Sequence, residues 1–181
     1  MDLFAFSGEK QTGFMRVMSV GGGDIRIEGR PTEAEADVYP ETTFAEIAAI
    51  CKHRNIRLTQ YIEEKEGKEI YDTLFQVWNT MQRAISDGLS TSGVLPGGLG
   101  VQRKAQQLFQ NRHIDESEAT RENRLVCAYA FAVSEQNADN GTIVTAPTCG
   151  ACSVVPAVLK YFQETRHFTD EDILRALAVG G

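Results

Sequence analysis

The sequence predicts a mainly α-helical protein with a small β element at its N-terminus. Apolar side chains recur at helical spacing through most of residues 43–181, with capping residues and glycines where helices would begin or end. Residues 14–28 behave differently, because two apolar-rich runs flank the three glycines at 21–23. That pattern is typical of two strands joined by a tight reversal. A phosphate-binding loop is the alternative, but no helix is signalled after these glycines.

The chain divides at a polar stretch near its start. Residues 1–30 hold the β element, residues 31–42 form a proline-containing linker, and residues 43–181 form a helical domain. Thr43 followed by Glu46 is a capping box, which places the start of the first helix. The organisation is therefore one helical domain preceded by a short β segment.

The remaining helices follow from apolar periodicity and terminal signals. They are expected at 59–65, 67–87, 101–110 and 117–138, and from Thr169 to the final glycines. Thr59 is expected to open the second helix and Gly88 to end the third as its C-cap. Asp172 is expected to complete the cap of the last helix at Thr169.

The composition narrows the classes of partner. A net charge of −7 disfavours binding to nucleic acid, because both molecules would be negatively charged. No apolar run approaches the ~18 residues that cross a membrane, and the N-terminus lacks the pattern of a secretory signal. Four cysteines are too few for a disulfide scaffold in 181 residues. We therefore expect a cytoplasmic protein with neither a nucleic-acid nor a membrane partner.

The segment around Cys149 and Cys152 carries the strongest chemical signal. A β-branched run at 142–145 predicts a buried strand, and 153–162 predicts a helix that contains Pro156. Thiols between the two would lie at the positive end of a helix dipole, which favours thiolate. The Cys-x-x-Cys spacing also suits a dithiol redox centre or half of a metal site.

A complete metal site within this chain is not expected. The three histidines show no paired spacing, and the other two cysteines lie on apolar helical faces. Two alternatives to a metal enzyme therefore stay open at this stage. One is a thiol–disulfide oxidoreductase that uses Cys149 and Cys152, and the other is a non-catalytic helical interaction domain.

A second unusual stretch covers residues 89–100. It combines four glycines and a proline with apolar residues, which predicts a loop packed against another surface. Arg103 and Lys104 follow at once, and a basic pair beside such a loop could hold a carboxylate. A solvated helix face is the alternative for this pair.

Four ordered blocks resemble the iron–sulfur-dependent L-serine dehydratases, also called L-serine ammonia-lyases. The segment 144–159 is similar to that family's core signature, 77–81 to its WNTM helix and 92–99 to its GVLPG loop. Residues 19–23 resemble the end of the family's β domain. The resemblance thus implies the tail of a β domain at 1–30 and the first half of a serine dehydratase α domain at 43–181.

The resemblance implies a lyase that converts L-serine to pyruvate and ammonia. A 4Fe–4S cluster acts in that family in place of pyridoxal phosphate, with an open iron as Lewis acid on the serine hydroxyl. Water leaves, and the aminoacrylate that forms is hydrolysed. The implied substrate-binding residues are Thr145, Pro147, Thr148, Cys149, Gly150, Ala151, Cys152, Gly93, Pro96, Gly97 and Arg103.

The chain departs from the family pattern at both ends and at Cys149. Many members carry Asn at that position, so Cys149 and Cys152 are only weak candidate cluster ligands. The resemblance places the family's cluster cysteines beyond Gly181, and its serine-binding segments and base before Met1. We therefore expect this chain alone to be inactive, with its missing halves on the same polypeptide or on a partner chain, and we expect a homo-oligomer.

Overall fold

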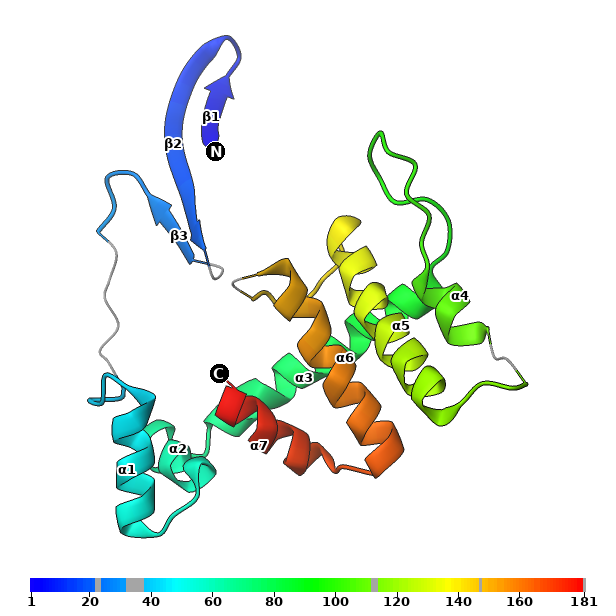
Figure 1. The fold of residues 1–181 in the computed structure, drawn as a ribbon. Helices are drawn as coiled ribbons and strands as arrows, with labels where there is room; N and C mark the ends of the chain where they lie inside the picture. Colours follow the sequence, from blue (N-terminus) through cyan, green and yellow to red (C-terminus); the bar gives the residue numbers. More distant parts are fainter. Residues whose placement is uncertain (22–23, 32–37, 112–113, 147, 181) are drawn as a thin grey trace.

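The computed structural model describes residues 1–21, 24–31, 38–111, 114–146 and 148–180. Three strands form an antiparallel sheet in chain order: β1 (Asp2–Ser7), β2 (Lys10–Gly21) and β3 (Asp24–Ile27). The helices of the described residues are α1 (Phe44–Arg54), α2 (Leu58–Glu66), α3 (Ile70–Ser90), α4 (Ala105–Gln110), α5 (Glu118–Ala138), α6 (Cys149–Arg166) and α7 (Asp170–Gly180). The sheet stands apart from the helices, and α7 lies against α3 (Figure 1).

The predicted mainly helical fold is confirmed, and the sheet is larger than predicted. Strands β2 and β3 pair with Gly21 opposite Asp24, so the chain reverses between them as expected. Gly22 and Gly23 lie outside the described residues. Strand β1 was not predicted; it pairs with β2 so that Phe4 faces Phe14 with ring centroids 5.2 Å apart. Every residue of β1 is exposed, and its apolar run from Leu3 to Phe6 lacks the alternation of a half-buried strand.

The predicted capping box of α1 is confirmed. Thr43 Oγ1 accepts from the Glu46 amide at 3.3 Å, and Glu46 Oε2 accepts from the Thr43 amide at 3.2 Å. Helix α2 begins one residue earlier than predicted, so Thr59 does not open it. There the Gln60 side chain accepts from the backbone N–H of Arg57 at 2.8 Å, and Arg57 takes the N-cap position.

Helix α3 carries the predicted apolar stripe into the core. Trp78, Met81 and Ile85 are all buried. Gly88, however, is not a C-cap: it lies inside α3, which continues to Ser90. A Cβ at Gly88 would come within 2.3 Å of the Ala132 carbonyl oxygen on α5. The glycine therefore serves close helix packing instead of helix termination.

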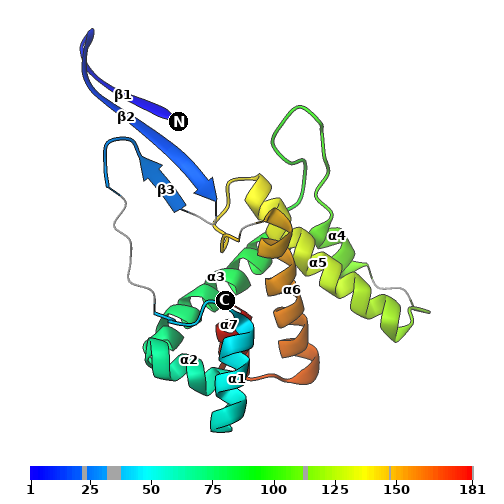
Figure 2. The same cartoon turned by 60° about the vertical axis from the view of Figure 1, so that its left-hand side comes forward.

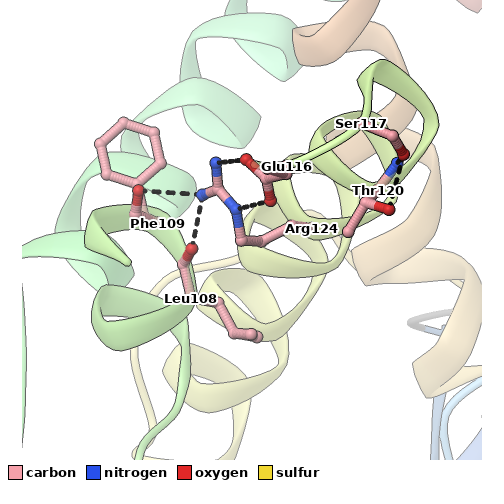
Figure 3. A network of polar contacts seen from close by, with 6 residues as sticks. All are labelled: Leu108, Phe109, Glu116, Ser117, Thr120 and Arg124. Carbon is pink, nitrogen blue, oxygen red and sulfur yellow. Dashed lines mark hydrogen bonds and ion pairs between the residues drawn. The ribbon is translucent and has the colours of Figure 1, made fainter. Parts of the chain in front are cut away.

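A buried ion pair joins α4 to the beginning of α5. Arg124 donates to both carboxylate oxygens of Glu116, at 2.6 and 2.9 Å, and to the carbonyls of Leu108 and Phe109 (Figure 3). The Arg124 and Glu116 side chains are 10% and 6% exposed. The hydrogen bonds to Glu116 hold the pKa of Arg124 above its ordinary value.

Helix α4 begins at Ala105, four residues later than the predicted 101.

The predicted strand at 142–145 is wrong, and α6 begins earlier than predicted. Residues 141–146 have no strand hydrogen bonding. Ile143 instead packs on the cluster around Tyr129, and Val144 on the cluster around Trp78. The run has half-buried Ile143 and Val144 packed on helices and exposed Thr142 and Thr145, and among the described residues no neighbouring strand lies beside it for pairing. Periodicity alone does not separate these two situations.

Helix α7 has the predicted cap. The Thr169 amide donates to Asp172 Oδ2 at 3.0 Å, and Thr169 Oγ1 accepts from the Asp172 amide at 3.2 Å. In the described part of the chain no helix is long and apolar enough to cross a membrane.

Candidate functional site

The start of α6 is built by Thr148. Its hydroxyl accepts from the Ala151 amide at 3.3 Å, and its carbonyl accepts from the Ala151 and Cys152 amides at 3.1 and 3.3 Å. Gly150 is exposed, and nothing lies within 4 Å of the place where its Cβ would be. The N-terminal turn of α6 is therefore open to solvent, with its positive dipole end available to an anion.

The Cys-x-x-Cys motif lies within this first turn, not in a loop before the helix. Cys152 is 4% exposed, and its neighbour Ser153 is buried and donates to the Gly150 carbonyl at 3.0 Å. Cys149 is the first residue of α6, and its side chain lies outside the described part of the structure, as does Pro147. Burial of Cys152 disfavours the dithiol redox alternative, because thiol exchange requires access.

The glycine-rich stretch does not pack against the described helices of this chain, so its predicted packing surface is not found there. The α3–α4 loop, residues 91–104, extends away from the helices in both views (Figures 1 and 2). Leu99 is 92% exposed, and Val94 is exposed as well. The loop is held by its own backbone: Leu95 N–H donates to the Val101 carbonyl at 2.8 Å, and Arg103 N–H to that of Gly93 at 2.9 Å.

The residues predicted to bind substrate therefore lie in two separate groups. Gly93, Pro96 and Gly97 are exposed on the α3–α4 loop. Thr145, Thr148 and Gly150 are exposed next to or within the start of α6, and Ala151 is half-buried. Within the described residues no backbone hydrogen bond joins the two groups, and the α3–α4 loop extends away from the helices, so the structure does not by itself bring them into one pocket.

Arg103 is not an open carboxylate-binding group. Its side chain is 3% exposed, and Nη2 donates to the carboxylate of Asp139 at the C-terminal end of α5. Lys104 is exposed, and its ammonium lies 5.9 Å from the centre of the Phe131 ring. The basic pair is therefore neither a free anion site nor a solvated helix face, because Arg103 points inward and Lys104 outward.

Two residues that sequence reasoning missed anchor this region. Asp139 holds Arg103, and Glu135 accepts from the backbone amides of Lys104 and Ala105 at 2.5 and 3.2 Å. Glu135 follows Ala128 and Ala132 at helical spacing, and both alanines are fully buried. The sequence signal that could have identified Glu135 is its place on the same helix face as these buried small residues.

Metal ligands are sparse in the part of the chain that the structure describes. No group of three or more His, Cys, Asp or Glu side chains in the described ranges could hold a metal ion. The cysteines with described side chains lie on different helices: Cys51 on α1, Cys127 on α5 and Cys152 on α6. Any cluster would need ligands from outside the described residues.

Comparison with known proteins identifies the family. A model of the family described as serine dehydratase alpha chain matches residues 31–181. The chain belongs to the serine dehydratase alpha-chain family. It is 35% identical to L-serine dehydratase 1 of Escherichia coli over 96% of this chain, and 36% identical to L-serine dehydratase of Haemophilus influenzae over 90%. It is 30% identical to L-serine dehydratase of Streptomyces coelicolor over the whole chain.

The chain spans about two fifths of these relatives: 41% of the first, 39% of the second and 43% of the third. Within the serine dehydratase family match lie the helix with Trp78, the α3–α4 loop and the start of α6. Trp78 and the segment before α6 meet in the core through Val144. The end of β2 also comes near this segment in both views (Figures 1 and 2).

Proposed function

We propose that the protein containing this chain converts L-serine to pyruvate and ammonia. The observation that carries the proposal is the family match over 31–181, supported by relatives that are named L-serine dehydratases. Loss of water from L-serine gives aminoacrylate, and hydrolysis of its imine tautomer gives pyruvate and ammonium. Because the chain spans only part of its relatives, this activity is proposed for the whole protein.

The role that we assign to this chain is to form one wall of the serine site. The exposed N-terminal turn of α6 offers backbone N–H groups and a positive dipole end, which suit the substrate carboxylate. Thr145 and Thr148 are exposed beside it and supply hydroxyls for the substrate's polar groups. Gly93, Pro96 and Gly97 of the α3–α4 loop would cover the bound molecule from the other side.

A 4Fe–4S cluster is part of the proposal, with an open iron that would supply Lewis acid chemistry at the serine hydroxyl. Since the described residues do not form a cluster site, we assign its ligands to a continuation of the polypeptide or to a partner chain. The same source would provide the rest of the β and α domains. We further propose a cytoplasmic location, because iron–sulfur ligation requires reduced thiols. We propose a homo-oligomer because exposed apolar surface favours association.

The test is an anaerobic assay of the native protein that contains these residues. We expect iron–sulfur absorption in the visible range, and pyruvate and ammonium formed in equal amounts from L-serine. The 181-residue chain assayed alone should form neither. Absence of serine-dependent pyruvate from the cluster-loaded native protein would contradict the proposed reaction. Turnover by the isolated chain would contradict the assignment of the cluster ligands to other residues.

A further inference from the structure

The last turns of α5 hold two loops at once. On one side, Glu135 Oε1 accepts from the amides of Lys104 and Ala105, and the Asp139 carboxylate accepts from Arg103. These contacts fix the base of the α3–α4 loop. On the other side, Asp139 is the C-cap of α5 and the first residue of the α5–α6 loop, residues 139–148. A short stretch of one helix therefore sets the position of both loops.

Backbone contacts carry this constraint into each loop. Arg103 N–H donates to the Gly93 carbonyl at 2.9 Å, which closes the α3–α4 loop above the ion pair. Asp139 N–H donates to the Glu135 carbonyl at 3.1 Å, and Gly141 N–H to that of Gln136 at 2.7 Å. Release of the Arg103–Asp139 pair would therefore loosen both loops and not only the one that contains Arg103.

The cluster is not arranged for maximal stability. Glu135 is 4% exposed, and the Arg103 side chain is 3% exposed. Within the described residues, Arg103 Nη1 and Glu135 Oε2 are buried without a hydrogen-bond partner. Unsatisfied atoms on buried charged groups cost free energy, and an apolar replacement of similar volume would avoid that cost. The cluster therefore calls for an explanation beyond holding the fold together.

We propose that Arg103, Asp139 and Glu135 are positioning residues that set the α3–α4 loop relative to the start of α6. Arg103 does not touch substrate, because its guanidinium is buried. It acts through the loops that contain Gly93 on one side and Thr148 on the other. The catalytic meaning of this arrangement rests on the proposed function, but the coupling of the two loops does not.

The test compares Asp139→Asn and Arg103→Lys with Arg124→Lys. Asp139 is 45% exposed in its side chain, so its isosteric amide variant should fold. Arg124→Lys weakens another arginine–carboxylate pair, near the other end of α5, in which both side chains are at most 10% exposed and the arginine contacts α4 instead of either loop. The readouts are amide hydrogen exchange in the native protein, and KM and kcat for L-serine.

In Asp139→Asn and Arg103→Lys we expect exchange at Leu95 and Gly141 to accelerate together, by about tenfold or more. KM should rise by about tenfold with a smaller change in kcat, because the binding wall is displaced while the reacting groups stay. Arg124→Lys should accelerate exchange only around α4 and the first turns of α5, and should leave KM unchanged.

Acceleration in only one of the two loops would overturn the proposed coupling. An equal rise of KM in Arg124→Lys would show that the Arg103, Asp139 and Glu135 cluster contributes only to general stability and does not position the loops. If the wild-type protein neither binds nor turns over L-serine, the proposed function fails, and the exchange comparison still decides whether the cluster couples the loops.

Discussion

Gly88 lies where α3 comes close to the backbone of α5. A Cβ there would lie 2.3 Å from the Ala132 carbonyl oxygen and 2.7 Å from its Cα. This glycine was predicted to end the helix because glycine is the usual residue at a helix C-cap. Nothing local distinguishes a glycine that ends a helix from one that admits a neighbouring backbone, since the neighbour is 44 residues away along the chain.

We predict that Gly88→Ala destabilises the protein. Alanine adds about 1 kcal/mol of helix propensity, but the backbone contact forces α3 and α5 apart. Overpacking of this kind costs about 1–3 kcal/mol, and contact with backbone places the case at the upper end. We expect a net loss of about 2 kcal/mol in the free energy of unfolding, measured by urea denaturation. Gly98→Ala, with nothing within 4 Å, is the control and should leave stability unchanged.

At the scale of helices and strands, capping boxes were predicted more reliably than features that depend on tertiary packing. The caps at Thr43 and Thr169 were predicted correctly because each involves residues only three positions apart. The strand at 142–145 was predicted wrongly because its burial comes from α3, α5 and α6. The surroundings of the α3–α4 loop were also not predicted from its sequence, because its apolar residues Val94 and Leu99 are exposed.

The capping box of α1 predicts a pH dependence of stability. Backbone N–H groups of Thr42 and Thr43 hold the pKa of Glu46 below its ordinary 4.5. A carboxylate with a lowered pKa in the folded state stabilises the fold fully above its unfolded pKa. That contribution is lost as pH falls through the folded value.

Glu46→Gln keeps a side chain that accepts hydrogen bonds but removes the titration. We expect wild type to be more stable than the variant at neutral pH, and the difference to shrink below pH 4.5. Thermal unfolding of both proteins across this range measures it. A difference that stays constant down to strongly acid pH would show that the Glu46 charge does not contribute.

At the scale of the whole molecule, the sheet is the least buried part. Phe4 and Phe14 pack against each other on one face of it, yet they are 54% and 49% exposed. Strand β2 and the turn after it were predicted from the sequence. The exposure of the sheet was not, because it depends on what covers these strands. Exposed aromatic pairs of this kind favour association.

We therefore predict that the 181-residue chain self-associates through the sheet. Replacing both Phe4 and Phe14 by Thr keeps strand propensity while removing the aromatic surface. Sedimentation velocity over a concentration series should show association in the parent chain and a clear reduction in the double variant. Phe75→Gln, which changes a 45% exposed phenylalanine on α3, should associate like the parent. An equal reduction of association in Phe75→Gln and in the double variant would show that the contact does not lie on the sheet.

The central claim is that the start of α6 binds L-serine, and Thr148 tests it most directly. Thr148→Ala removes the hydroxyl that caps α6 and leaves the rest of the turn intact. Loss of such a cap costs about 1 kcal/mol of stability. The control is Thr165→Ala, because the Thr165 hydroxyl donates to the Tyr161 carbonyl near the other end of the same helix.

The deciding measurement is kcat/KM for L-serine in the native protein and in these two variants. We predict a fall of about tenfold or more for Thr148→Ala, with Thr165→Ala close to wild type. Equal values for Thr148→Ala and Thr165→Ala would contradict the assignment of this helix start to the serine site.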